Sequence, residues 1–185
     1  MSISIMKSYD YQSRRGIKEI SWKEFGFLSR ALSESLSCIQ PQIVIGIARA
    51  GLFPAAAVAC MLRLELYPVR ITRRENDRIV HQSPIWKVPI LGDLENKKII
   101  VIDEIADTGE TLSLVKQAVY SKGAKLVHSA ALISHSWAEP APDISALVSD
   151  ELIIFPWDKE VLIEGKWQIH PEIAAAIQAQ SRSKQ

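Results

Sequence analysis

Short apolar segments alternate with amphipathic, helix-like segments along most of the chain. The apolar segments are rich in Ile, Val and Leu, and they cover residues 42–48, 66–72, 98–103 and 126–134. Most of their side chains are apolar at consecutive positions, which indicates strands buried on both faces. Because such strands alternate with helices, the sequence predicts an α/β fold with a doubly wound, mostly parallel sheet.

The helical segments carry recognisable start signals. Ser21 precedes apolar residues at helical spacing, and Glu24 follows it by three residues, which is the pattern of a capping box. A second, alanine-rich helix has Pro54 in its first turn, where proline is tolerated. Further helices are predicted from about residue 110 to 121 and over residues 170–180.

One stretch interrupts the alternation of strands and helices. Residues 73–92 mix charges and prolines with apolar side chains, and a long irregular stretch inside a compact domain is usually functional or mobile. Around it we expect three parts: an N-terminal arm over residues 1–19, a single domain over 20–178 and a flexible tail over 179–185.

Composition narrows the class of protein. The 185 residues are 48% hydrophobic, which suits one domain with a substantial core. The 22 basic and 21 acidic residues leave a net charge of +1, so neither nucleic acid nor an anionic membrane is expected as a partner. No segment has the pattern of a signal peptide or a spanning helix, and we expect a cytoplasmic protein. Cys38 and Cys60 are expected to be buried free thiols.

The segment IIVIDEIADTGETL, residues 99–112, places Asp103, Glu104 and Asp107 around the end of an apolar strand. Asp103 and Glu104 come at the end of a strand, where ligands bind in open α/β sheets. The turn that follows leads into a helix N-terminus, whose unpaired N–H groups favour phosphate. The paired acids can accept hydrogen bonds from a sugar diol or hold a magnesium ion that the diol also binds. Taken alone, Asp107-Thr108-Gly109 is equally typical of a simple helix cap.

Several motifs together resemble the type I phosphoribosyltransferases, closest to the small xanthine-guanine and hypoxanthine phosphoribosyltransferases of bacteria and archaea. The segment IIVIDEIADTGET resembles the family's signature for phosphoribosyl pyrophosphate (PRPP), and IVIGIARAGLFPAAAVA resembles its pyrophosphate loop. FPWD and SWKEF also match, so that the resemblance covers roughly residues 20–160 in consistent order. It implies the type I fold with a mobile hood loop. It also implies an enzyme that transfers the ribose 5-phosphate group of PRPP to a 6-oxopurine, releases pyrophosphate and uses Mg²⁺.

The resemblance assigns roles at the PRPP site. Asp103 and Glu104 would hold the ribose hydroxyls and, with Asp158, the metal. Asp107 would also act as the general base near N7 of the purine. The 5′-phosphate would be bound by Ala106, Asp107, Thr108, Gly109, Glu110 and Thr111. The pyrophosphate would be bound by Ala48, Arg49, Ala50 and Gly51, with a cis peptide bond expected between Ala48 and Arg49.

The resemblance also assigns a hood and a base pocket. Arg73, Arg74 and Arg78 in the hood would help to neutralise the pyrophosphate, although a solvated basic loop is the alternative. His135 takes the place of a lysine that reads the 6-oxo group in purine relatives; a structural histidine is the alternative. The remaining base-binding assignments are Leu152 in place of a stacking aromatic, Ile153 through its main chain, and Asp158.

Two further interpretations stay open. The same chemistry can serve another acceptor base, or the chain can be a PRPP-binding regulator without turnover. In either case the expected partners are PRPP and, for an enzyme, a nucleobase. The resemblance further implies a homodimer or homotetramer.

Overall fold

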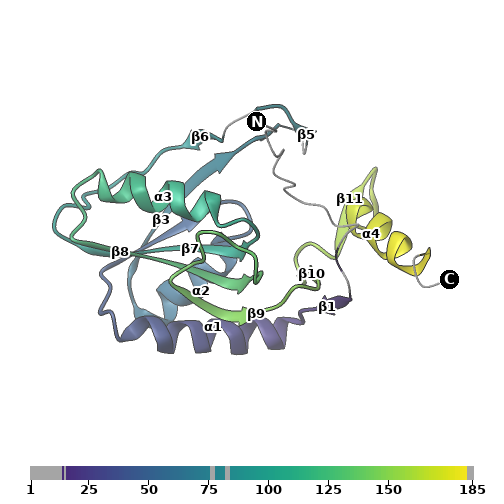
Figure 1. Ribbon diagram of the computed structural model, residues 1–185, viewed down its shortest axis with the longest axis horizontal. Coiled ribbons are helices and arrows are strands. Elements are labelled where there is room, and N and C mark those ends of the chain that lie inside the picture. Colours follow the sequence, from purple (N-terminus) through teal and green to yellow (C-terminus); the bar gives the residue numbers. More distant parts are fainter. Residues whose placement is uncertain (1–13, 15, 76–77, 82–83, 183–185) are drawn as a thin grey trace. The chain divides into compact units, whose positions relative to one another are not determined.

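Figure 1 presents a computed structural model of the chain. The structure describes residue 14 and residues 16–75, 78–81 and 84–182. Leu28–Val148 form one compact unit, and the described parts of Met1–Phe27 and Ser149–Gln185 form another. This division falls inside the single domain that the sequence predicted.

The larger unit contains a six-stranded sheet with the strand order β6-β3-β2-β7-β8-β9. All neighbouring strands are parallel except β6, which runs antiparallel to β3 at one edge. This arrangement confirms the predicted α/β fold with a mostly parallel sheet. The strands are β2 (Ile43–Ile47), β3 (Glu65–Thr72), β6 (Ile85–Val88), β7 (Lys98–Ala106), β8 (Leu126–Ser134) and β9 (Ile144–Val148).

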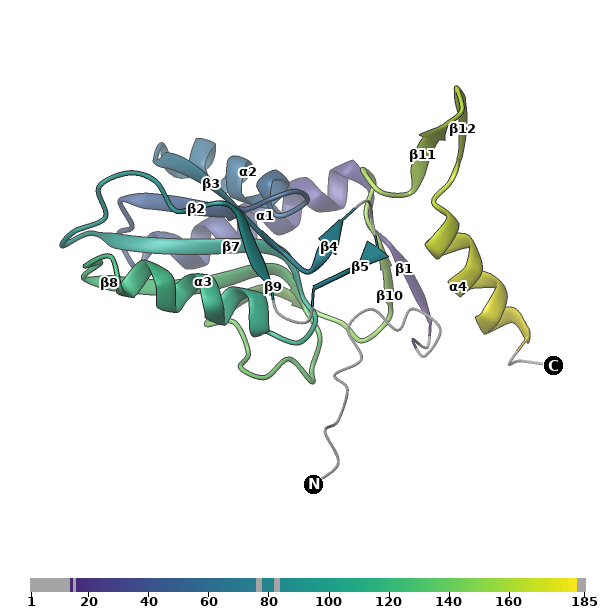
Figure 2. The ribbon, with the colours of Figure 1, turned by 90° about the horizontal axis from the view of Figure 1, so that it is seen from above.

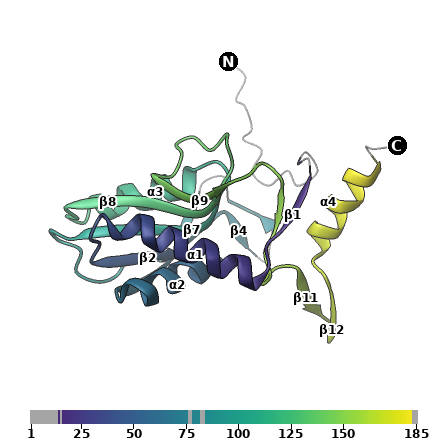
Figure 3. The same cartoon turned by 90° about the horizontal axis from the view of Figure 1, so that it is seen from below.

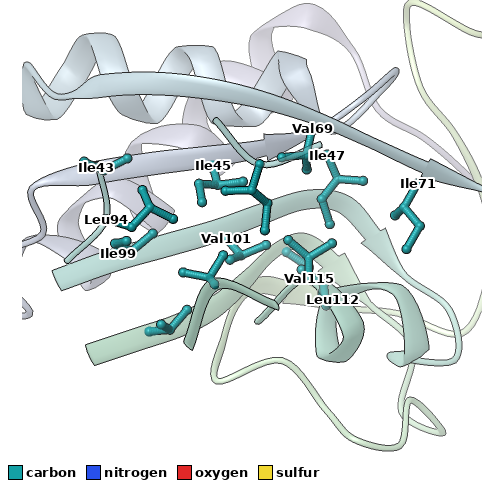
Figure 4. Close-up of a cluster of buried hydrophobic side chains, with 14 of the residues drawn as sticks. Ile43, Ile45, Ile47, Val69, Ile71, Leu94, Ile99, Val101, Leu112 and Val115 are labelled. Atoms are coloured by element: carbon teal, nitrogen blue, oxygen red, sulfur yellow. The ribbon is translucent and has the colours of Figure 1, made fainter. Parts of the chain in front are cut away.

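Helices cover both faces of this sheet. The part of α1 (Trp22–Ser37) that belongs to the larger unit and α2 (Leu52–Leu62) lie on one face, and α3 (Glu110–Tyr120) lies on the other (Figures 1 and 3). Strand β7 shows why its sequence is apolar without alternation. Ile100 and Ile102 pack in the cluster beside α1 and α2, whereas Ile99 and Val101 pack in the cluster beside α3 (Figure 4).

The stretch over residues 73–92 contains short strands rather than a structureless loop. β4 (Arg74–Glu75) pairs with β5 (Arg78–Ile79) in an antiparallel ladder, and β6 joins the edge of the main sheet. β7 also runs farther than predicted. It was predicted to end at Asp103 but continues to Ala106, so Glu104 as well as Asp103 lies within the strand.

The smaller unit combines a strand pair, a hairpin and a helix. β1 (Ile17–Glu19) pairs in parallel with β10 (Leu152–Ile154). β1 falls within residues 1–19, the segment predicted as an arm. β11 (Glu160–Ile163) and β12 (Lys166–Ile169) form a hairpin that leads into α4 (Pro171–Arg182), as Figure 2 shows. α4 continues past residue 178, where the tail was expected to begin. Of that tail, residues 183–185 lie outside the described part of the chain, as do most residues of the predicted arm.

Two local predictions have clear outcomes. The capping box of α1 is confirmed: the Ser21 N–H donates to Glu24 Oε2 at 2.9 Å, and the Glu24 N–H donates to Ser21 Oγ at 3.1 Å. The prediction that Cys38 and Cys60 are buried is wrong. Both are free thiols, but both are exposed, because Cys38 follows the end of α1 and Cys60 falls outside the buried face of α2.

Candidate active site at the switch point of the sheet

The two loops that the sequence singled out leave neighbouring strands. β2 pairs with β7 in the middle of the sheet, and the chain then winds outward to β3 on one side and to β8 on the other. Such a point, where the winding direction reverses, leaves a crevice beyond the carboxyl ends of the two strands and is the usual ligand site of open α/β sheets. Residues 48–51 follow β2, and residues 107–109 follow β7.

Gly51 brings the first loop against the acidic pair. A Cβ atom at this position would lie 2.6 Å from Asp103 Oδ1 and 2.9 Å from Asp103 Cα. Only a residue without a side chain fits at that distance, so the glycine allows the loop backbone to approach β7. The expected cis peptide bond between Ala48 and Arg49 is confirmed. The predicted pyrophosphate loop and a predicted ribose-binding acid are therefore direct neighbours.

Asp103 and Glu104 are adjacent carboxyl groups, and Glu104 disfavours the ionisation of Asp103. Asp103 Oδ1 accepts a hydrogen bond from the Glu104 N–H at 2.9 Å. Dense packing around the half-buried Asp103 raises the pKa of its carboxyl well above the ordinary value, and the neighbouring Glu104 carboxylate raises that pKa further. Hydroxyl donors or a cation at this place would relieve the cost of the two adjacent charges.

The turn after β7 is built around Gly109. Gly109 is the N-cap of α3 with φ +80°, and a Cβ there would collide with the Pro140 carbonyl oxygen. Glycine is thus required both for backbone conformation and for space. The Glu110 N–H makes a long hydrogen bond to Thr108 Oγ1 (3.4 Å), and the first turn of α3, with its positive dipole end, begins at Glu110. This geometry suits an anion such as the 5′-phosphate.

Asp107, the predicted general base, lies beside two aromatic side chains. Trp137 Nε1–H donates to Asp107 Oδ1 at 3.3 Å, and His135 Nε2 lies 4.0 Å from the same oxygen. His135 is only 4% exposed and stacks on Trp137, with ring centroids 4.4 Å apart. The structure therefore brings His135 to Asp107. Sequence reasoning assigned no role to Trp137; its place after the end of β8 was the available signal.

The hood arginines are described only in part. Arg73 directly follows β3, and its carbonyl oxygen accepts hydrogen bonds from the Val80 N–H (3.0 Å) and the His81 N–H (3.1 Å). The side chains of Arg74 and Arg78 lie outside the described residues. Neutralisation of pyrophosphate by these three arginines stays a prediction.

The other residues assigned to the base belong to the smaller unit. Leu152 is 2% exposed and packs with Ile173 and Ala176 of α4, so we assign its side chain to this core and not to stacking on a base. Ile153 lies in β10, where it pairs with Lys18. The Asp158 N–H donates to the Phe155 carbonyl oxygen at 3.1 Å. Base binding by Ile153 and Asp158, and metal binding by Asp158, stay predictions.

The acidic pair fits a magnesium ion shared with substrate. Among the described residues, no group of three or more His, Cys, Asp and Glu side chains can hold a metal by itself. Mg²⁺ is usually bound by one or two carboxylates together with substrate phosphates and water, not by a cage of protein ligands. Asp103 and Glu104 supply such carboxylates next to the predicted pyrophosphate loop.

Known proteins resemble this chain over most of its length. The model of the phosphoribosyl transferase domain matches residues 17–164. The xanthine-guanine phosphoribosyltransferase of Nitratidesulfovibrio vulgaris is 29% identical over 150 residues, which cover 80% of this chain and 88% of that protein. The one from Ruegeria sp. is 30% identical over 156 residues, which cover 75% of this chain and 84% of that protein.

Solved structures agree with these sequence matches. The purine phosphoribosyltransferase from Pyrococcus horikoshii has 29% sequence identity and a TM-score of 0.71, with coverage of 82% of this chain and 100% of that one. The Helicobacter pylori xanthine-guanine-hypoxanthine phosphoribosyltransferase, at 23% identity and a TM-score of 0.66, shares the fold. No helix among the described residues is long and apolar enough to cross a membrane. The family model matches most of this chain, and the candidate site lies at the switch point of the sheet. This chain therefore belongs to the phosphoribosyl transferase domain family.

Proposed function

We propose that this protein transfers the 5-phosphoribosyl group of PRPP to a 6-oxopurine such as xanthine, guanine or hypoxanthine, and releases pyrophosphate. One observation carries the proposal: the loop of residues 48–51 lies directly against Asp103, beside the glycine turn that precedes α3. The residues expected to bind the two phosphorylated ends of PRPP thus flank the pair expected to bind its ribose. The names of the matched relatives support a purine as the acceptor.

PRPP would bind across the carboxyl ends of β2 and β7. Its 5′-phosphate would accept hydrogen bonds from the turn of residues 106–111, where the N-terminus of α3 favours negative charge. Its pyrophosphate would lie on residues 48–51, with the Arg49 guanidinium as a charge-assisted donor. The ribose hydroxyls would donate to Asp103 and Glu104.

The reaction is a displacement at C1 of the ribose. A nitrogen of the base forms a bond to C1 while the bond from C1 to the pyrophosphate oxygen breaks, with inversion, and positive charge builds on the ribose in the transition state. The carboxylates of Asp103 and Glu104, bound to the ribose hydroxyls, would stabilise that charge. Arg49 stabilises the negative charge that gathers on the leaving group. Magnesium held by Asp103 and Glu104 with substrate oxygens would add to this neutralisation. Asp107 takes the proton that the base loses.

The pair of Asp107 and His135 supports a 6-oxopurine over adenine. N7 and the 6-oxo group lie on the same edge of a 6-oxopurine. A proton acceptor is needed near N7, and a hydrogen-bond donor is needed at the 6-oxo oxygen. Asp107 offers the acceptor, and His135 Nε2, 4.0 Å from Asp107 Oδ1, offers a ring nitrogen that can donate. The assignment of Ile153 and Asp158 to the base rests on the family resemblance alone. The hood arginines would complete the proposed pyrophosphate site.

The setting of the enzyme is also part of the proposal. The free, exposed thiols of Cys38 and Cys60 are compatible with a reducing cytoplasm. A homodimer or homotetramer, as the resemblance implies, is measurable by size-exclusion chromatography with light scattering.

The function is tested by measuring pyrophosphate release from PRPP in the presence of Mg²⁺ and a panel of bases. We expect turnover with xanthine, guanine or hypoxanthine and little with adenine or pyrimidines. Turnover with one of the latter alone would support a different acceptor. Tight PRPP binding without turnover on any base would replace the enzyme by a regulator. The double variant Asp103→Asn/Glu104→Gln should lose most turnover, and full activity in it would refute the assigned ribose site.

A further inference from the structure

The segment of residues 135–140 runs alongside the turn that follows β7. The His135 N–H donates to the Ala106 carbonyl oxygen at 3.0 Å, and the Glu139 N–H donates to the Thr108 carbonyl oxygen at 3.0 Å. Next to the second of these hydrogen bonds, the Pro140 carbonyl oxygen lies against Gly109. Backbone contacts therefore hold the two segments together on both sides of Asp107.

Trp137 adds a side-chain contact between these two backbone hydrogen bonds. Its indole Nε1–H donates to Asp107 Oδ1 at 3.3 Å, between the backbone hydrogen bonds at Ala106 and Thr108. The torsion that orients a carboxylate has a broad energy profile, so an aspartate side chain does not orient itself. A donor fixed beside one oxygen restricts the plane of the carboxylate.

The donor is itself fixed by the histidine beneath it. The indole of Trp137 and the imidazole of His135 stack with centroids 4.4 Å apart and an angle of 17° between their planes. His135 is 4% exposed, whereas Trp137 is 45% exposed, so the buried ring supports the partly exposed one. An aromatic side chain has two rotatable torsions, and stacking on a buried ring removes most of its remaining freedom.

We propose that Trp137 is a positioning residue for the transferase reaction: it holds the Asp107 carboxylate in the orientation that receives the proton of the base. The inference rests on the proposed function, because Asp107 is the proton acceptor there. Proton transfer requires a heavy-atom separation within hydrogen-bonding distance and correct alignment, so a loosened carboxylate lowers the rate of the chemical step. PRPP binding relies on donors of the turn over residues 106–111 and on Asp103 and Glu104, not on the orientation of the Asp107 carboxylate, and should not change.

The variant Trp137→Phe keeps an aromatic ring for stacking on His135 and removes the N–H donor. We expect kcat to fall about tenfold, as for the loss of one hydrogen bond to a carboxylate, with the KM for PRPP unchanged. Trp167→Phe is the matched control, because Trp167 is 71% exposed on the β11–β12 hairpin, and it should leave both constants unchanged. A kcat within twofold of the wild type, or a KM for PRPP that rises as much as kcat falls, would overturn the inference.

A second measurement does not depend on turnover. The indole N–H signal of Trp137, identified by its absence in Trp137→Phe, is followed in ¹H–¹⁵N spectra of the wild type and of Asp107→Ala. Loss of the carboxylate acceptor should move this signal toward the position of the exposed Trp167 indole, which itself should not move. An unmoved Trp137 signal overturns the inference even in an active enzyme. No turnover on any base, together with a signal that moves, refutes the proposed function and leaves the hydrogen bond established.

Discussion

The backbone of Gly51 packs directly on the side chain of Asp103. A Cβ at Gly51 would lie within 2.9 Å of three atoms: the Ile47 carbonyl oxygen, Asp103 Oδ1 and Asp103 Cα. Two of these belong to the backbone of buried strands and cannot move aside cheaply. This contact joins the loop after β2 to the acid at the end of β7, and it therefore determines the distance between the two halves of the proposed PRPP site.

The substitution Gly51→Ala should damage both stability and substrate binding. Forcing a methyl group into this contact should cost about 1–3 kcal/mol of the free energy of unfolding, measured by chemical denaturation. PRPP affinity, measured by calorimetry, should fall as well, because the loop shifts away from Asp103. Gly26→Ala is the control: Gly26 is in α1 with nothing within 4 Å of its Cβ position, so alanine should stabilise the helix by about 0.5–1 kcal/mol. Unchanged PRPP affinity in Gly51→Ala would contradict the role of this contact.

Gly109 offers a test of space against backbone conformation. Gly109 and Gly165 both have positive φ values, +80° and +76°, but only Gly109 has an atom where a Cβ would go. Gly165→Ala should cost about 1 kcal/mol, the price of the left-handed conformation alone. Gly109→Ala should cost more, since the Pro140 segment must also move, and should lose PRPP binding. Equal losses of stability in the two variants would show that the Pro140 contact is unimportant.

Asp103→Asn should stabilise the protein without substrate while it impairs turnover. The pKa of Asp103 is raised in the folded state by burial and by Glu104, so the folded protein binds this proton more tightly than the unfolded chain does. This tighter proton binding stabilises the folded protein fully below the ordinary aspartate pKa. The stabilisation is lost as pH rises through the higher pKa of the folded state. At pH 7–8 we expect the variant to melt about 2–4 °C higher than the wild type. The difference should vanish below about pH 4, and a difference that grows toward low pH would contradict this account.

Asp143 should show the opposite dependence on pH. Partial burial raises its pKa, but the Lys116 ammonium at 2.6 Å and the N–H and hydroxyl of Ser129 outweigh burial and hold that pKa below the ordinary value. The stabilisation is therefore present above the ordinary aspartate pKa and is lost as pH falls through the lower folded pKa. After allowance for solvent screening, Asp143→Asn should cost about 1 kcal/mol at pH 7, measured by denaturation.

Asp93 provides the control for Asp143. Its side chain is 74% exposed and pairs with Lys97 at 3.1 Å on the surface, where ion pairs contribute little to stability. Asp93→Asn should leave the unfolding midpoint unchanged. Equal effects of the two substitutions would mean that the Lys116–Asp143–Ser129 contact contributes nothing beyond an exposed ion pair.

Sequence-based predictions failed where the same local pattern is compatible with more than one structure. The hairpin of β11 and β12 went unpredicted, although its two-residue turn, Glu164 and Gly165, has positive φ at both positions, as a tight hairpin turn requires. Cys38 and Cys60 were expected to be buried because their neighbours are apolar, yet burial depends on which face of a helix meets the sheet. Leu152 was aligned with a base-stacking residue, but α4 covers it.

The sequence by itself determined the alternation of the main strands and helices along the chain and the place of the acids and the glycine turn. These depend on signals local to the chain: consecutive apolar residues in strands with two buried faces, capping residues at Ser21 and Glu24, and a glycine before a helix. Only the tertiary structure decided that Gly51 meets Asp103 and that Trp137 meets Asp107. Those contacts join segments that are distant in sequence, and they arise because the parallel pairing of β2, β7 and β8 brings the carboxyl ends of these strands to one edge of the sheet.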